Sequence, residues 1–78
     1  MQKKMEKLYL QVMQYIREDI AERRPDYLES ERVLQDRLKM SRTTIRRAFR
    51  ELEREKLIIP IHGKGYMVNY PGAPAGRI

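Results

Sequence analysis

Four arginines fall within the ten residues from Ser41 to Arg50, and no acidic residue lies among them. In a helix, Arg42, Thr43 and Arg46 would share one exposed face near the N-terminal end. Guanidinium groups bind phosphates and guanine edges, and a DNA-reading helix uses its N-terminal residues for this. Taken in isolation, a solvated helix face that happens to be positive explains the pattern equally well. The charges after Arg50 are mixed, however, so the positive excess sits at the end that reads a groove, which favours DNA.

A second candidate segment is His62-Gly63-Lys64-Gly65. Its two glycines permit a tight turn and a close approach of the backbone to a phosphate or a minor groove. Lys64 adds a cation, and His62 can donate a hydrogen bond. For a lone Gly-x-Gly, an ordinary hairpin turn is the better explanation. The segment lacks the third glycine and the following helix of a dinucleotide-binding fingerprint.

Enzymatic chemistry is poorly supported by the residue types present. The chain has a single histidine and no cysteine, so it cannot form a disulfide and is a poor candidate for a metal site. No nucleophile, base and acid occur in a supporting motif, and the glutamates at i,i+4 spacing are typical of solvated helix faces. We therefore expect no enzyme, no catalytic residue, no metal and no cofactor.

The bulk composition limits the partners. The chain has 78 residues, a formal net charge of +6 and 36% charged residues, with a mean hydropathy of −0.76. This describes one small basic domain without a membrane span or a signal peptide, for which we expect a polyanionic partner and a cytoplasmic location.

Three helices should position the arginines. Apolar residues recur every three or four positions from Met5 to about Glu22, before a proline at position 25. A second helix should begin with Ser30 as its N-cap and fade near residues 39–40. A third should begin at Ser41 and run to about Lys56. The short connection between the last two is typical of a helix-turn-helix.

A β-hairpin should follow the helices. Residues 57–61 and 66–70 read as two strands joined by the glycine turn, and Pro60 confines the first strand to an edge or an irregular position. The predicted fold is mainly α with a small hairpin, a winged helix-turn-helix of three helices and a two-stranded wing. We assign it to residues 1–70 and interpret residues 71–78 as a linker or tail.

Several segments together resemble one known family. Residues 30–32 (Ser-Glu-Arg), 41–46 (Ser-Arg-Thr-Thr-Ile-Arg), 52–58 and 62–68 look like the DNA-binding domain of GntR-family bacterial transcription regulators, over about residues 6–70. The resemblance implies a homodimeric repressor or activator that binds double-stranded DNA at a palindromic operator, and of the two roles it favours repression. An effector ligand, if any, would bind a C-terminal domain that is absent here, so we expect an excised or truncated protein rather than a naturally short one.

The resemblance also implies residue roles. Arg32 would touch the DNA backbone or a base, and Ser41 a phosphate. The major groove would receive Arg42, Thr43, Thr44 and Arg46. The minor groove would receive His62 and Gly63, with Lys64 nearby. Arg47 stands where the family usually has a glutamate, so it should add charge beside the reading face and strengthen non-specific binding.

Three further positions and the length of one loop depart from the family pattern. Glu29 replaces a proline, and the loop before it is about three residues short. Val33 replaces the capping-box glutamate, so Ser30 should cap less well. Lys39 replaces a glycine, where a left-handed residue would cost about 1 kcal/mol.

Three other functions remain open. The first is a winged helix that serves as a protein-interaction or dimerisation module without specific DNA binding. An RNA-binding domain is disfavoured because the strands lack a paired aromatic platform. A membrane-surface helix is the weakest, because the first helix carries acids such as Glu18, Asp19 and Glu22 on its polar side.

Overall fold

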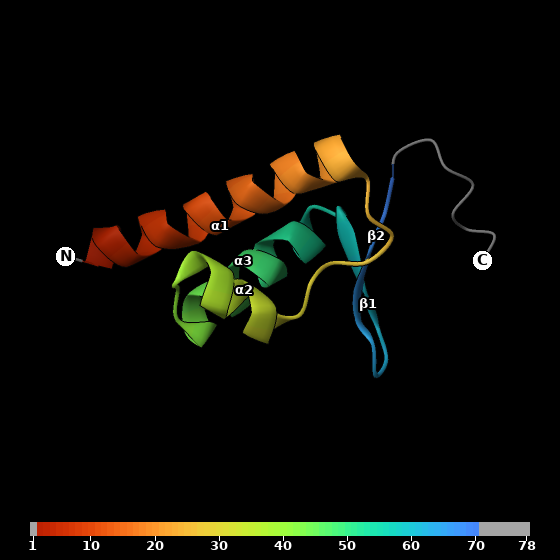
Figure 1. The fold of residues 1–78 in the computed structure, drawn as a ribbon. Helices are drawn as coiled ribbons and strands as arrows, with labels where there is room; N and C mark the ends of the chain where they lie inside the picture. Colours follow the sequence, from red (N-terminus) through yellow and green to blue (C-terminus); the bar gives the residue numbers. More distant parts are fainter. Residues whose placement is uncertain (1, 71–78) are drawn as a thin grey trace.

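The computed structural model describes residues 2–70, and side chains from residue 8 onward (Figure 1). The elements are α1 (Gln2–Arg23), α2 (Glu31–Leu38), α3 (Arg42–Arg54), β1 (Ile58–Ile61) and β2 (Gly65–Val68). The order of three helices and a two-stranded antiparallel hairpin confirms the predicted winged helix-turn-helix. The proposed linker at 71–78 lies outside the described residues.

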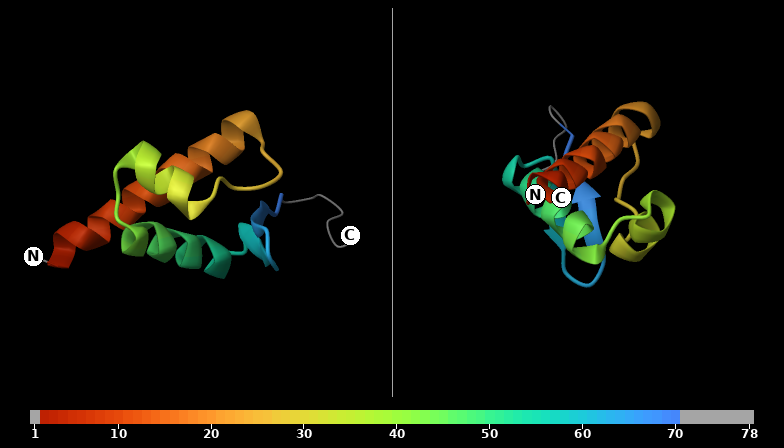
Figure 2. Two further views of the ribbon diagram at one scale, coloured as in Figure 1. Left: turned by 60° about the horizontal axis from the view of Figure 1, so that its bottom comes forward. Right: turned by 90° about the vertical axis from the view of Figure 1, so that its left-hand side faces the viewer.

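Helix α1 lies along α3 and supplies one side of the core (Figure 2). Its buried residues Val12, Ile16 and Ile20 recur at four-residue spacing, as an amphipathic helix requires. The helix starts three residues before the predicted Met5 and ends at Arg23. It stops there because Arg24 adopts a left-handed φ of 46° immediately before Pro25.

Helix α2 is capped at both ends. The Ser30 side chain accepts a hydrogen bond from the Val33 N–H at 3.2 Å, so the cap forms although Val33 cannot return the second bond of a capping box. Lys39 ends the helix in the left-handed region, with φ 56° and ψ 44°. The residue that replaces the family's glycine therefore does adopt the strained conformation expected from the sequence.

Helix α3 is the central element of the fold. Ile45, Ala48, Phe49 and Leu52 are buried as predicted. The helix ends at Arg54, two residues before the predicted end. Lys56 has a φ of 67°, and the N–H of Leu57 bonds the Leu52 carbonyl at 3.0 Å. This is a Schellman ending, which stops the helix and starts the chain toward β1.

The hairpin pairs Ile58 with Val68, Ile59 with Met67, Pro60 with Tyr66 and Ile61 with Gly65. The strands are shorter than predicted, because Leu57, Asn69 and Tyr70 lie outside the regular pairing. Ile58 and Val68 turn inward onto the helices.

The loop after α1 joins the sheet, which the sequence did not predict. Tyr27 forms a one-residue antiparallel bridge with Met67, and the Leu28 N–H bonds the Tyr66 carbonyl at 3.0 Å. β2 therefore has partners on both sides and β1 lies at the edge, which is one of the two positions predicted for the strand that contains Pro60.

A single hydrophobic core joins α1, α2, α3 and both strands. Phe49 meets Tyr66 edge-on, with ring centroids 5.0 Å apart, and so connects α3 to the wing. The core fixes the wing relative to α3. Among the described residues, no helix is long and apolar enough to cross a membrane.

Candidate nucleic-acid interface

The start of α3 is fixed by a hydroxyl pair. Ser41 Oγ accepts a hydrogen bond from the Thr44 N–H at 3.1 Å and lies 2.9 Å from Thr44 Oγ1. Thr44 is only 5% exposed. In this structure the Thr44 side chain therefore faces Ser41 and the core rather than the exposed surface, and its expected entry into a major groove stays a prediction. Thr44 instead holds the N-cap residue in place, whereas Ser41 itself stays exposed.

Arg42, Thr43 and Arg46 are all exposed on the first turns of α3, on the face expected from their spacing. The Arg46 Nε donates to Glu31 of α2 at 2.8 Å, and the Arg42 Nε lies 3.5 Å from the other oxygen of the same carboxylate. The hydrogen bond to Glu31 raises the pKa of Arg46 above its ordinary value, so this group stays charged. The structure thus brings the two arginines together through Glu31, a residue that the sequence did not identify as part of the site.

Arg47 lies on the other flank of α3. Its guanidinium carbon is 4.2 Å from the centroid of the Tyr9 ring on α1. A cation above an aromatic face is stabilised without losing its charge. Arg47 is therefore an exposed cation between α3 and α1, separate from the pair of arginines that faces α2.

Arg50 is a candidate that the sequence analysis counted in the arginine run but did not assign to the site. It is exposed and lines a hollow of about 260 Å³ between α3 and the wing, which Arg46 and Tyr66 also line. Its position four residues after Arg46, on the same side of the helix, is the signal that could have identified it.

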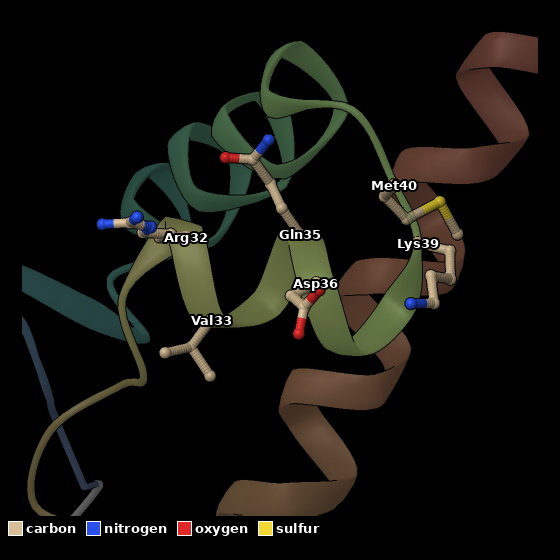
Figure 3. A pocket seen from close by; sticks show the side chains of 6 residues that line it. All are labelled: Arg32, Val33, Gln35, Asp36, Lys39 and Met40. Carbon is tan, nitrogen blue, oxygen red and sulfur yellow. The ribbon is translucent and has the colours of Figure 1, made fainter.

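Arg32 is exposed on the first turn of α2. It lines a shallow surface hollow of about 570 Å³ that continues along α2. Figure 3 shows Arg32 at one end of this hollow and Lys39 and Met40 at the other. Among the side chains described, residues 8–70, Arg32 forms no ion pair.

The wing tip carries His62, Gly63 and Lys64, all exposed. The Lys64 N–H closes the turn on the Ile61 carbonyl at 2.9 Å, and Gly63 and Gly65 have φ of 76° and 87°. Nothing lies within 4 Å of a Cβ added at either glycine, so the glycines serve the backbone conformation rather than close internal contacts. The tip projects away from α1, on the side where α2 lies (Figures 1 and 2).

The structure thus combines a helix-turn-helix formed by α2 and α3, exposed arginines at the start of α3 and a glycine-containing wing. Such an arrangement defines a winged helix domain of the DNA-binding class. The sequence model described as "Bacterial regulatory proteins, gntR family" matches residues 8–68. The chain belongs to the GntR family and comprises the DNA-binding domain of its transcriptional regulators.

Solved structures agree with this assignment. A GntR family transcriptional regulator from Listeria monocytogenes has 34% identity and a TM-score of 0.73, and the match covers 78% of this chain and 56% of that chain. A transcriptional regulator from Oenococcus oeni has 33% identity and a TM-score of 0.68, with 78% and 53% covered.

A third structure bears a different title. A transcriptional antiterminator from Listeria monocytogenes EGD-e has 28% identity and a TM-score of 0.70, with 88% of this chain and 57% of that chain covered. The present chain therefore spans a little over half the length of each of these three proteins. No curated protein matches the chain.

Proposed function

We propose that this domain binds double-stranded DNA sequence-specifically, with α3 in the major groove and the wing in the minor groove. The observation that carries the proposal is the exposed arrangement of Arg42, Thr43 and Arg46 at the start of α3. Arginine pairs with the O6 and N7 atoms of guanine, and the N-terminal residues of a recognition helix are those that reach base edges.

The remaining contacts fall to the DNA backbone and the minor groove. Ser41 and the start of α3 offer hydrogen-bond donors to a phosphate. Arg32, Arg47 and Arg50 supply cations around the reading face, and none of them pairs with a carboxylate among the side chains described. At the wing, His62 and the Gly63 backbone approach the minor groove, and Lys64 contacts a neighbouring phosphate.

We further propose that two copies bind a palindromic operator and repress transcription in the cytoplasm. The names of the similar structures support a role in transcription. A palindrome follows if the two copies are related by a two-fold axis, since each then reads one half-site. An effector, if the regulator responds to one, would bind a C-terminal domain outside this chain.

Selection of bound sites from a pool of random duplexes tests the proposal. We expect a recovered palindrome whose half-sites contain guanine at the positions that Arg42 and Arg46 read. Arg42→Ala should then lose about 1–3 kcal/mol of discrimination between the recovered site and a scrambled duplex. Arg54→Ala is the matched control, because Arg54 is an exposed arginine on the last turn of α3.

Two results would contradict the proposal. An Arg42→Ala protein that discriminates as well as the wild type would remove α3 from the reading role. A wild-type protein that binds no duplex, even at low salt, would instead support the alternative of a protein-interaction module.

A further inference from the structure

Glu31 is shared by the two arginines to which we assign base reading. It is the first residue of α2, and its side chain is 30% exposed. One carboxylate oxygen accepts from Arg46 Nε at 2.8 Å, and the other lies 3.5 Å from Arg42 Nε. A single acid on α2 therefore connects two cations that are four residues apart on α3.

The atoms used in these contacts matter. Both contacts run through Nε, and among the described residues the Nη groups of Arg42 and Arg46 donate no hydrogen bond. Guanine O6 and N7 accept two hydrogen bonds from the paired N–H donors of an arginine side chain. Glu31 thus holds each guanidinium from its inner side and leaves the outer amino groups available.

Glu31 is not needed to cap α2. The hydrogen bond to the Val33 N–H comes from Ser30 Oγ. The Glu31 carboxylate is occupied by α3 instead, so its charge can be removed while the helix cap stays in place.

We propose that Glu31 is a specificity-determining positioning residue for DNA recognition, an inference that rests on the proposed function. It restricts the rotamers of Arg42 and Arg46 before DNA arrives, so less side-chain entropy is lost when they meet the correct bases. It also offsets part of their positive charge, which weakens their attraction to phosphates of any sequence. Both effects raise the ratio of specific to non-specific affinity.

The test compares the 78-residue wild type with Glu31→Gln on two duplexes of equal length, the site recovered by selection and its scrambled version. We expect Glu31→Gln to bind the scrambled duplex about 3–10-fold more tightly, with a salt slope steeper by about 0.9 for each arginine released to a phosphate. The ratio of the two affinities should fall at least tenfold.

Glu51→Gln is the matched control. Glu51 also pairs with an arginine of α3, Arg54, but at the far end of the helix. The control removes the same charge and should change both affinities by one common factor. Glu31→Asp keeps the charge and shortens the reach, so it should lower the ratio without tightening the scrambled complex. Glu31→Asp also keeps the inference testable if a thermal melt shows that Glu31→Gln is not folded.

The outcomes separate this inference from the proposed function. If the wild type discriminates between the duplexes and both Glu31 variants retain its ratio, the inference is overturned and the proposed function stands. If the loss is confined to a single cytosine position, Glu31 reads that base directly and positioning is overturned. A wild type that binds both duplexes alike overturns the proposed function and this inference with it.

Discussion

The guanidinium of Arg47 lies over the ring of Tyr9, 4.2 Å from its centroid, and joins α3 to α1. An aromatic face orders an arginine without neutralising it, unlike the Glu31 carboxylate that pairs with Arg42 and Arg46 on the opposite flank. The two flanks of α3 therefore differ in kind. One carries arginines whose charge is partly offset, and the other carries a fully charged group on an apolar support.

This difference predicts the effect of Arg47→Ala. The substitution should weaken binding to all duplexes alike and reduce the slope of log K against log salt by about 0.9, the value for one phosphate contact. Tyr9→Leu should give part of the same loss, whereas Tyr9→Phe should retain the wild-type slope because the ring remains. Fluorescence anisotropy titrations at four salt concentrations would measure the slopes. A loss that depended on the base sequence would place Arg47 among the base readers instead.

The left-handed Lys39 predicts a stabilising substitution. A side chain at φ 56° is strained, and glycine removes the strain while adding entropy to the unfolded chain. We expect Lys39→Gly to raise the free energy of unfolding by roughly 0.5–1 kcal/mol, measured as a higher urea midpoint at an unchanged m-value. Lys39→Ala keeps the Cβ and should show no such rise. Equal midpoints for the two variants would mean that the strain is relieved elsewhere.

The bidentate ion pair between Arg17 and Glu55 predicts a pH dependence of stability. The Arg17 Nη atoms donate to both oxygens of Glu55, at 2.8 and 3.0 Å, and this contact lowers the pKa of Glu55 below its ordinary value. A depressed carboxyl pKa stabilises the fold above the unfolded-state pKa, and that stability is lost as the pH falls through the folded-state pKa. Both side chains are nearly half exposed, so solvent screening limits the contribution to at most about 1 kcal/mol.

Glu55→Gln should therefore lower the free energy of unfolding at pH 7, and its difference from the wild type should shrink as the pH falls and the wild-type carboxyl takes up a proton. Urea titrations of both proteins from pH 7 downward would measure the gap. Glu22→Gln on α1 is a suitable control for the loss of one negative charge. A gap that stayed constant with pH would show that the amide fails for steric rather than electrostatic reasons.

Local sequence patterns predicted the helices and strands. The features that they did not predict depend on contacts between residues far apart in the sequence. The apolar spacing from Ile45 to Leu52 identified both the helix and its buried face, and the N-caps Ser30 and Ser41 followed from residue type. Lys39 was predicted as a strained helix end only because the family resemblance supplied a glycine for comparison. These features depend on neighbours within a few positions, which a sequence displays directly.

The Tyr27 bridge and the Glu31 contacts depend on tertiary placement. Tyr27 lies in a segment without strand periodicity. It pairs with Met67, forty residues later, because the core holds the two segments side by side. Glu31 reaches Arg46 across the turn between α2 and α3. The burial of Thr44 was missed for a related reason: beside the exposed Thr43, it occupies a boundary position where helical spacing alone does not decide between core and surface.

The buried position of Thr44 beside Ser41 gives a direct test of which residues of α3 read the DNA bases. Thr44→Val keeps the buried volume but removes the hydroxyl that lies 2.9 Å from Ser41 Oγ. We expect a loss of about 1 kcal/mol in the free energy of unfolding, the usual contribution of one hydrogen bond, with the base preference from site selection unchanged. Thr43→Val is the matched control, since the same change at the exposed neighbour should leave stability nearly unaltered and shift DNA binding. If Thr44→Val changed the preferred base while stability held, the Thr44 hydroxyl would have to turn outward toward the groove when DNA binds.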